Sequence, residues 1–445
     1  MKIILKNSSF IILLIILFSC AKDDVYDKDN AISAFYQIDP FAPLNKEQDI
    51  KIESQKTVSN WNFGDNLHQG GRVGNFKKKY SYKKDQISLK KVANIWLDFD
   101  LIHQKSSTSD PVINDNNAYF LDDSGVLNAY DLNSFKKLWS KRIFKRLFFE
   151  SYNNPKIFGL SDKIIAISGN NEVVAIDIKG ENILWSKKLP ALIVSKPIIS
   201  DGLVYVACDK NELYALQAHD GKTLWSHSGI LQNTAIFGAA DPVIYGNTIF
   251  VSYSSGEIYA LNKNNGQEIW SFDLNLNNKA VNSDFYLSDI DATPIVNNNV
   301  IYVVGNGGSM VAIKADSGDV LWQKQIATVI DFHLSGNFLY VINNDSKLIA
   351  INKENGDIKW LKQLNRYKNP KKPHTKIIYN SMIMAGDKIL ISDSLGKIFI
   401  IAPLTGEIEK EIKIGNKGFN DIIVMNDKIY LNKSNFFGSY FISLQ

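Results

Sequence analysis

The side chains most often used in catalysis and metal binding are few in this chain of 445 residues, and none forms a recognisable motif. Its histidines lack the HxH or HExxH spacing that brings two imidazoles to one metal ion. No serine lies in a GxSxG turn, and no phosphate-binding P-loop is present. The glycine-rich stretch Gly305–Gly308 falls between two expected strands, where a tight hairpin explains it. The sequence predicts no catalytic residue, no metal site and no cofactor, although a site assembled from distant positions stays open.

One of the two cysteines, Cys20, has neighbours that indicate a covalent modification. Lys2 and Lys6 flank the start of the chain, and residues 10–18 are continuously apolar. This stretch is too short to span a bilayer and is typical of a secretory signal. Leu17-Phe18-Ser19-Cys20 resembles the bacterial lipobox, which implies cleavage before Cys20 and lipidation of that residue. An uncleaved anchor is the alternative.

The other cysteine, Cys208, ends the strand-like run Val204–Cys208. If Cys20 carries lipid, Cys208 has no intramolecular disulfide partner, even in an oxidising compartment. We expect a buried, unreactive thiol.

The N-terminal pattern divides the chain into four parts. Residues 1–19 are a signal peptide, 20–60 a polar and flexible tether, 61–90 a segment leading into the folded part, and 91–445 the fold itself. Ala21, rather than aspartate, follows the modified cysteine, which favours retention in the outer membrane, facing the periplasm. The net charge of +4 is too small to indicate a nucleic-acid partner.

A repeat dominates the folded part. Six alanines are each followed, ten residues later, by a tryptophan: Ala129/Trp139, Ala175/Trp185, Ala215/Trp225, Ala260/Trp270, Ala312/Trp322 and Ala350/Trp360. A period of roughly 40 to 50 residues built from strands indicates a β-propeller.

Each repeat reads as two strands joined by a tight turn. The alanine lies in a short apolar run, and a glycine such as Gly266 stands four residues before the tryptophan, where it can take the positive φ of a hairpin. The small alanine allows neighbouring sheets to approach, and the tryptophan fills the gap between them. The tryptophans are therefore predicted to pack between blades.

Two incomplete repeats at the ends of the fold complete each other. Ile95-Trp96 looks like a tryptophan strand without a hairpin, and residues 439–444 look like an alanine strand with Ser443 in the small position. A further repeat has Ile400 and Lys410 in place of alanine and tryptophan. We predict an all-β, eight-bladed propeller of four-stranded antiparallel blades, in which N- and C-terminal strands close the last blade and Trp96 joins the packing tryptophans. Seven blades with a decorated start is the alternative.

The repeat resembles those named for pyrroloquinoline quinone (PQQ) dehydrogenases, but it encodes blade packing rather than a cofactor site. Residues 61–445 and the lipobox are more similar to the BamB family of lipoproteins. The similarity is carried by Trp61–Asn75 (WNFGDNLHQGGRVGN) and by Leu287–Val296 (LSDIDATPIV). This resemblance implies a scaffold in the machinery that assembles outer-membrane β-barrels, with the BamA subunit as partner.

The resemblance also implies a binding site. Asp289 and Asp291 match two aspartates on family loops that contact BamA, and Ile236 and Phe237 align with a second such loop. In a strand, Asp289 and Asp291 would point the same way; beside an apolar tip they would suit a basic partner. The alternatives are that the aspartates cap the turn before Thr293-Pro294 and that Phe237 packs between blades.

We therefore expect a non-enzymatic, lipid-anchored scaffold that binds BamA and guides unfolded outer-membrane proteins. One rival is a PQQ-dependent periplasmic dehydrogenase, which would need the quinone and Ca²⁺. The absence of the adjacent cysteine pair that such enzymes usually carry counts against it. The other rival is an envelope lipoprotein that binds cell-wall glycan or another protein.

Overall fold

The computed structural model describes residues 48–62, 72–73, 75–76, 91–96, 109–114, 116–122, 124–145, 155–230, 240–274, 289–415, 418, 421–425, 428–435 and 438–444. All of them lie in one compact unit, Phe41–Gln445. Within these residues no helix is long and apolar enough to cross a membrane. The signal peptide and Cys20 lie outside the described residues, as does the tether up to residue 47.

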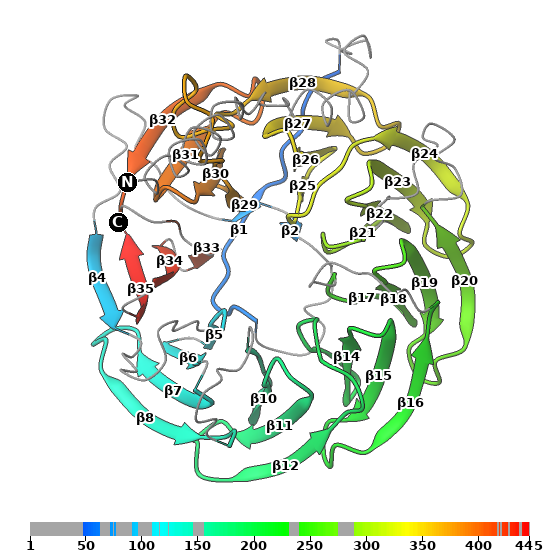
Figure 1. Cartoon of the computed structure of the whole chain (residues 1–445), viewed down its shortest axis with the longest axis vertical. Helices are drawn as coiled ribbons and strands as arrows, with labels where there is room; N and C mark the ends of the chain where they lie inside the picture. Colours follow the sequence, from blue (N-terminus) through cyan, green and yellow to red (C-terminus); the bar gives the residue numbers. More distant parts are fainter. Residues whose placement is uncertain are drawn as a thin grey trace, which may run out of the picture. The chain divides into compact units, whose positions relative to one another are not determined.

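The described residues form eight sheets, each built on four antiparallel strands and arranged around a central opening (Figure 1). Blade 1 consists of β5 (Val112–Asn114), β6 (Asn117–Leu121), β7 (Val126–Asp131) and β8 (Lys137–Arg142), and blade 2 of β9 (Lys156–Gly159), β10 (Lys163–Ile167), β11 (Glu172–Asp177) and β12 (Ile183–Lys188). Blade 3 consists of β13 (Ile198–Ser200), β14 (Leu203–Cys208), β15 (Glu212–Gln217) and β16 (Thr223–Ser228), and blade 4 of β17 (Val243–Tyr245), β18 (Thr248–Ser252), β19 (Glu257–Asn262) and β20 (Glu268–Asp273).

Blade 5 consists of β21 (Ile295–Asn297), β22 (Val300–Val304), β23 (Ser309–Lys314) and β24 (Val320–Gln325), and blade 6 of β25 (His333–Ser335), β26 (Phe338–Ile342), β27 (Lys347–Asn352) and β28 (Ile358–Gln363). Blade 7 consists of β29 (Tyr379–Ala385), β30 (Lys388–Asp393), β31 (Lys397–Ile401) and β32 (Ile408–Lys413), and blade 8 of β33 (Asp421–Met425), β34 (Lys428–Asn435), β35 (Gly438–Leu444) and β4 (Lys91–Trp96). Of the four strands of each blade, the first is the innermost and the fourth lies at the rim (Figure 1). The all-β propeller prediction is confirmed, and eight sheets agree with the predicted blade count.

The strand directions define two ends of the blades. Because the strands alternate in direction, the connections from the fourth strand of one blade to the first strand of the next all lie at one end, which we call the loop end. The hairpins between first and second strands, and between third and fourth strands, lie at the other, which we call the turn end.

The alanine and the tryptophan of each repeat pair directly across the third and fourth strands. Ala175 is opposite Trp185 and Ala260 is opposite Trp270, and a bulge follows the alanine in both blades. The tryptophan ring reaches the next blade, as Trp185 does at the third–fourth hairpin of blade 3. Its indole N–H also donates to that blade, from Trp185 Nε1 to Ala218 O at 3.0 Å.

Trp322 and Trp360 make the same contact with the blade that follows each of them. Trp322 Nε1 donates to Lys353 O, and Trp360 Nε1 donates to Pro403 O, both at 2.9 Å. A Cβ built on Gly406 would lie 2.6 Å from the ring of Trp360, so that ring lies directly against the hairpin of blade 7. These contacts are of the kind that the sequence predicts for a tryptophan between blades.

The surroundings of Trp322 and Trp360 nevertheless differ from the prediction. The sequence predicts only that each tryptophan fills a gap between two blades. Each ring also contacts a tyrosine of its own blade, Tyr302 or Tyr340, with ring centroids 6.0 Å apart in both pairs. The physical reason lies in the register: Ala312 pairs with Tyr302 on one side and with Trp322 on the other. Because its side chain is a single methyl group, the two aromatic rings can meet over it. The predicted role of the alanine, to let neighbouring sheets approach, is therefore incomplete.

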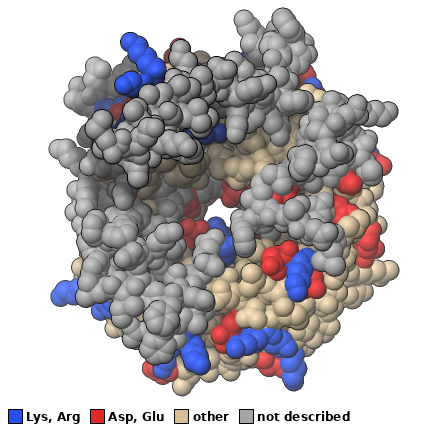
Figure 2. All heavy atoms as spheres, viewed as in Figure 1, with Lys and Arg blue, Asp and Glu red and all other residues tan. Residues whose placement is uncertain are grey.

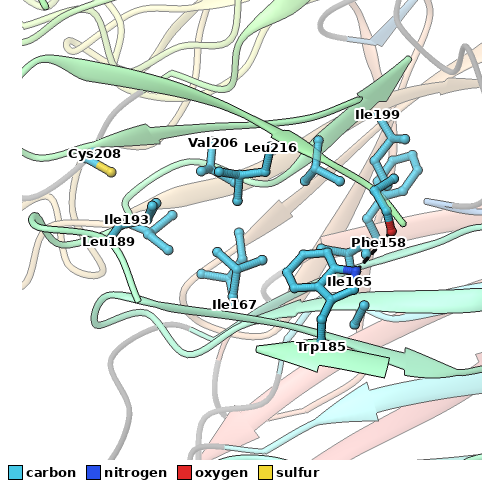
Figure 3. Packing of buried hydrophobic residues seen from close by; sticks show 14 of the residues in the cluster. Phe158, Ile165, Ile167, Trp185, Leu189, Ile193, Ile199, Val206, Cys208 and Leu216 are labelled. Atoms are coloured by element: carbon cyan, nitrogen blue, oxygen red, sulfur yellow. Dashed lines mark hydrogen bonds between the residues drawn. The ribbon is translucent and has the colours of Figure 1, made fainter. Parts of the chain in front are cut away.

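Apolar side chains of adjoining blades fill the remaining space between the sheets. Figure 3 shows Trp185 and Ile167 of blade 2 facing Ile199, Val206 and Leu216 of blade 3. The strands carry apolar residues on both faces because each sheet is covered on both sides by a neighbour.

Cys208 belongs to the same cluster (Figure 3). Its burial raises the pKa of the thiol to about 12, with Glu212 and Asp209 adding to the shift, so the thiolate is scarce at neutral pH. This fits the expected unreactive thiol.

The last blade is composite, as predicted, but the predicted place of Trp96 is wrong. β4 pairs with β35, and Ser443 lies opposite Ala93, whereas Trp96 lies opposite Tyr440. The position that matches Trp139 in register is therefore Ala93, three residues earlier. The physical reason is that β4 comes from a distant part of the chain, so no tight hairpin fixes its register to that of β35.

The predicted flexible tether ends earlier than residue 60. Residues 48–62 cross the central opening at the turn end, from blade 6 to blades 1 and 2 (Figure 1). At one side Asn337 holds this crossing segment, accepting from Lys51 N at 2.8 Å and donating to Asp49 O at 3.0 Å. At the other side Trp61 exchanges two backbone bonds with Ile113, at 2.9 and 2.8 Å. Backbone pairing, which composition does not reveal, orders this polar stretch.

Short strands extend the crossing segment within the opening. β1 (Gln55–Lys56) pairs with β3 (Asn75–Phe76), β3 pairs with β29, and β2 (Arg72–Val73) pairs with β25, all in parallel. Blades 6 and 7 thereby gain inner strands. The crossing segment thus joins opposite sides of the ring.

We predict that the glycine–tryptophan contact sets the stability of the ring. Gly221 has φ +73°, and a Cβ built there would lie 2.6 Å from the Trp185 ring, whereas Gly202 of the same blade has φ +74° and open space around it. Both alanine variants carry the left-handed backbone cost of about 1–2 kcal/mol. Gly221→Ala also disturbs the indole, so it should lower the free energy of unfolding by about 1–3 kcal/mol more than Gly202→Ala, measured by denaturant titration. An equal decrease in the free energy of unfolding for Gly221→Ala and Gly202→Ala would contradict a stabilising role for the glycine–tryptophan contact.

Candidate functional site

Polar and charged residues begin the inner strands at the loop end, and together they border the central opening. We call the following residues the channel ring: Asp110, Lys156, Lys196, Asp241, Thr293, Asp331, Ser381 and Asp421. Acidic and basic side chains are visible around the opening in Figure 2. Each blade contributes one residue, because each inner strand starts at the same end.

Two lysines of the channel ring lie among its carboxylates. Lys196 Nζ lies 2.8 Å from Asp110 Oδ2, and this attraction raises the pKa of Lys196 despite its burial. Lys156 Nζ donates to Val194 O, and burial lowers its pKa against the opposing effects of Asp241 and Asp110. The two cations thus offset part of the negative charge.

Ring carboxylates also join neighbouring blades through hydrogen bonds. Asp241 Oδ1 accepts from Lys196 N at 2.6 Å, and Asp331 Oδ1 accepts from Thr293 N at 2.8 Å. Between blades 7 and 8, Ser381 Oγ donates to Asp421 Oδ1 at 2.6 Å. Much of this acidic character is therefore engaged in holding the ring together.

The predicted site residues Asp289 and Asp291 lie in the connection that leads into β21, directly before Thr293 of the channel ring. The stretch Asp289–Thr293 has no strand structure, so the expectation of two carboxylates pointing the same way from a strand is wrong. Asp289 is 1% exposed, whereas Asp291 is partly exposed. Only Asp291 is therefore placed to touch a partner without rearrangement.

The electrostatics of Asp291 are unusual for an aspartate at a loop. Burial, and secondarily the neighbouring Asp289, raises the pKa of Asp291 to about 6. Its Oδ1 atom is buried and has no hydrogen-bond partner among the described residues. The turn-capping alternative also fails for the Thr293 amide, since that N–H donates to Asp331. A cationic group from outside would favour the ionised carboxylate.

The stretch is bonded to the connection between β16 and β17. Ala240 N, near the end of that connection, donates to Ile290 O at 3.2 Å. The predicted site residues Ile236 and Phe237 belong to the same connection, but they lie outside the described residues.

Exposed aliphatic residues accompany the charged groups at the loop end. They lie in four connections between blades: Leu192, Ile230, Val329 and Ile378 are 41%, 62%, 48% and 59% exposed. Val329 is two residues from Asp331, and Ile230 begins the β16–β17 connection. This end therefore combines apolar and acidic surface, a pairing suited to protein recognition.

Sequence reasoning missed the channel ring, although a signal was present. In four blades the ring residue directly precedes a proline, as in Asp110-Pro111 and Asp241-Pro242. A polar residue before a proline at the same point of a repeat marks the start of an inner strand.

Comparisons with known proteins place the chain in a family. The family model described as "Outer membrane protein assembly factor BamB" matches residues 123–362, more than half of the chain. The chain belongs to the BamB family. It is 24% identical over 216 residues to BamB of Yersinia pestis, covering 47% of this chain and 55% of that protein. It is 30% identical over 235 residues to an uncharacterised protein of Rickettsia conorii, covering 52% and 56%. The chain thus spans about half the length of these curated relatives.

The fold also matches solved BamB and enzyme structures. The crystal structure of BamB from Moraxella catarrhalis aligns with a TM-score of 0.64 at 17% identity, covering 80% of this chain and all of that one. A europium-containing methanol dehydrogenase aligns with the same TM-score at 10% identity, covering 84% of this chain and 96% of that one. Likeness at these identities concerns the propeller alone.

We predict that ionised Asp291 destabilises the fold in the absence of a partner. Its folded-state pKa of about 6 lies above the value of about 3.9 expected for the unfolded chain, so stability falls as pH rises between these values. Asp291→Asn should therefore raise the free energy of unfolding by about 1 kcal/mol at pH 7.5, after allowance for solvent screening. At pH 4 the variant should match the wild type. A gain that is the same at both pH values would show that charge is not its cause.

Proposed function

We propose that this protein is a non-enzymatic scaffold of the outer-membrane β-barrel assembly machinery and that it binds BamA through its loop end. Membership of the BamB family supports the role. The observation that carries the site is Asp291, a partly exposed residue with a raised pKa and a buried carboxylate oxygen that has no partner among the described residues. A basic side chain of BamA would complete its hydrogen bonding and favour its ionised form.

The surroundings of Asp291 support the same proposal. Val329 and Ile230 offer exposed apolar surface at the same end of the blades, and Ile236 and Phe237 are proposed to extend it. Apolar residues around a charged pair exclude water from it and strengthen the attraction. We assign the direct contact to Asp291; buried Asp289 acts on it electrostatically.

The proposal includes a membrane anchor. Lipid on Cys20 would hold the protein at the outer membrane, facing the periplasm. The described part of the crossing segment is bonded to Asn337 at the turn end, away from the proposed BamA site. The proposed partners at the loop end are BamA and unfolded outer-membrane proteins.

The likeness to a methanol dehydrogenase raises a PQQ enzyme as a second candidate, but the residues of the channel ring do not fit that cofactor. Asp110 is paired with Lys196, and Asp241 and Asp331 accept backbone amides. Within the described residues no group of three His, Cys, Asp or Glu side chains could hold a metal ion such as Ca²⁺. We derive no reaction for this protein.

Binding to BamA tests the proposal directly. The soluble chain starting at residue 21 should bind the purified periplasmic region of BamA from the same organism. Asp291→Asn should weaken that binding at least tenfold, which is about 1.4 kcal/mol. The matched control is Asp316→Asn, which changes an exposed carboxylate of the same blade at the turn end and should leave Kd unchanged. Absence of wild-type binding would overturn the proposed function, whereas equal Kd values for the wild type and Asp291→Asn would move the site elsewhere.

A further inference from the structure

The stretch Asp289–Thr293 is held in place by three described hydrogen bonds. Ala240 N donates to Ile290 O at 3.2 Å, and Asn306 N donates to Asp289 O at 2.8 Å. The third bond runs from Thr293 N to Asp331 Oδ1, at 2.8 Å. Of these three, the Asp331 bond is the one made by a side chain, so a substitution can remove it without moving the backbone donor.

The carboxylate of Asp331 provides the hydrogen-bond acceptor for the backbone amide of Thr293. Thr293 precedes Pro294, whose nitrogen carries no hydrogen, and the residue before a proline is restricted to extended conformations. A buried N–H without an acceptor is destabilising. Thr293 is 8% exposed, so its amide has little access to water. Asp331 therefore fixes the backbone two residues from Asp291.

The chain makes the same kind of bond two blades earlier, where Asp241 Oδ1 accepts from Lys196 N at 2.6 Å. Asp241 directly follows Ala240, which is bonded to Ile290, so that bond lies beside the same stretch. A side-chain bond between blades 7 and 8, in which Ser381 Oγ accepts from Ile422 N at 3.1 Å, involves none of these residues. Ser381 therefore serves as an internal control for any general effect of losing a bond between blades.

We propose that Asp331 is a positioning residue for partner binding, which holds Thr293 so that the partly exposed side chain of Asp291 keeps its place at the loop end. This inference rests on the proposed function, because it concerns the same contact with BamA. Asp331 acts through its hydrogen bond, and its negative charge is of secondary importance. Loss of the bond makes the backbone beside Asp291 more mobile. This stretch then loses conformational entropy when the partner binds, which weakens binding.

Four variants separate positioning from charge. Asp331→Ala removes the acceptor and should weaken BamA binding about tenfold. Asp331→Asn keeps an acceptor in the same place without the charge, and its Kd should stay within about threefold of the wild type. Asp331→Glu keeps the charge but displaces the acceptor, so it should bind more weakly than Asp331→Asn. Ser381→Ala removes a bond between blades 7 and 8 and should bind like the wild type.

The experiment measures Kd for the soluble chain starting at residue 21 with the periplasmic region of BamA, together with hydrogen exchange of peptides covering residues 289–293. Asp331→Ala and Asp331→Glu should speed exchange in this stretch, and Asp331→Asn should not. The positioning role is overturned if Asp331→Glu binds better than Asp331→Asn, which indicates charge, or if Ser381→Ala weakens binding as much as Asp331→Ala.

These outcomes distinguish the inference from the function on which it rests. If the wild type does not bind BamA, the proposed function fails and the positioning role fails with it. If the wild type binds and Asp331→Ala binds equally well, only the positioning role fails. Should Asp331→Ala not fold, the comparison of Asp331→Asn with Asp331→Glu still decides between positioning and charge.

Discussion

The contact between a tryptophan and the hairpin glycine of the next blade is the interaction on which the ring depends. The Trp225 ring fits against Gly266 at positive φ, where a Cβ would lie 2.6 Å from the ring. The indole N–H of Trp225 donates to Lys263 O of the same neighbouring blade, at 3.1 Å. A ring face and a directed hydrogen bond together fix both the distance and the rotation between two sheets. Repetition of this contact along blades 1 to 7 sets the spacing of their inner strands around the opening.

The chemistry of the loop end follows from that geometry. Eight strand starts gathered around one opening place charged side chains close together, and burial there makes unpaired charge costly. Most charges of the described channel ring are paired within the ring. Lys196 forms an ion pair with Asp110, and Asp241 and Asp331 each accept a hydrogen bond from a backbone amide of the preceding blade. Asp291, which lies two residues before Thr293 of the channel ring, differs because its Oδ1 atom has no partner among the described residues. Such an oxygen can accept a hydrogen bond from a cationic group of a partner.

The sequence was sufficient for features set by local, repeated constraints. The constant spacing from Ala260 to Trp270 reflects a hairpin that tolerates no insertion, and it predicts the pairing of the third and fourth strands. Features set by distant contacts were harder. The register of Trp96 depends on a partner strand more than 300 residues away, and residues 48–60 owe their order to Asn337 and Ile113 rather than to their own composition.

The candidate site shows the same division. The resemblance located Asp289 and Asp291, but it did not indicate that Asp289 is buried and Asp291 partly exposed. The role of Asp331 was invisible in the sequence because its partner, Thr293, lies in the preceding blade, 38 positions away. A single sequence indicates where each inner strand begins. Only the folded ring shows which residues at these positions contact one another across neighbouring blades.

The central claim is that the loop end of the propeller is the surface that meets BamA, and site-specific photo-crosslinking in living cells tests it most directly. A photoreactive residue would replace either Val329 at the loop end or Leu404 at the turn end, two aliphatic residues of similar exposure, 48% and 53%. The account predicts a crosslink to BamA from position 329 and none from position 404. A crosslink from position 404 alone would contradict it, as would BamA crosslinks of equal yield from both positions.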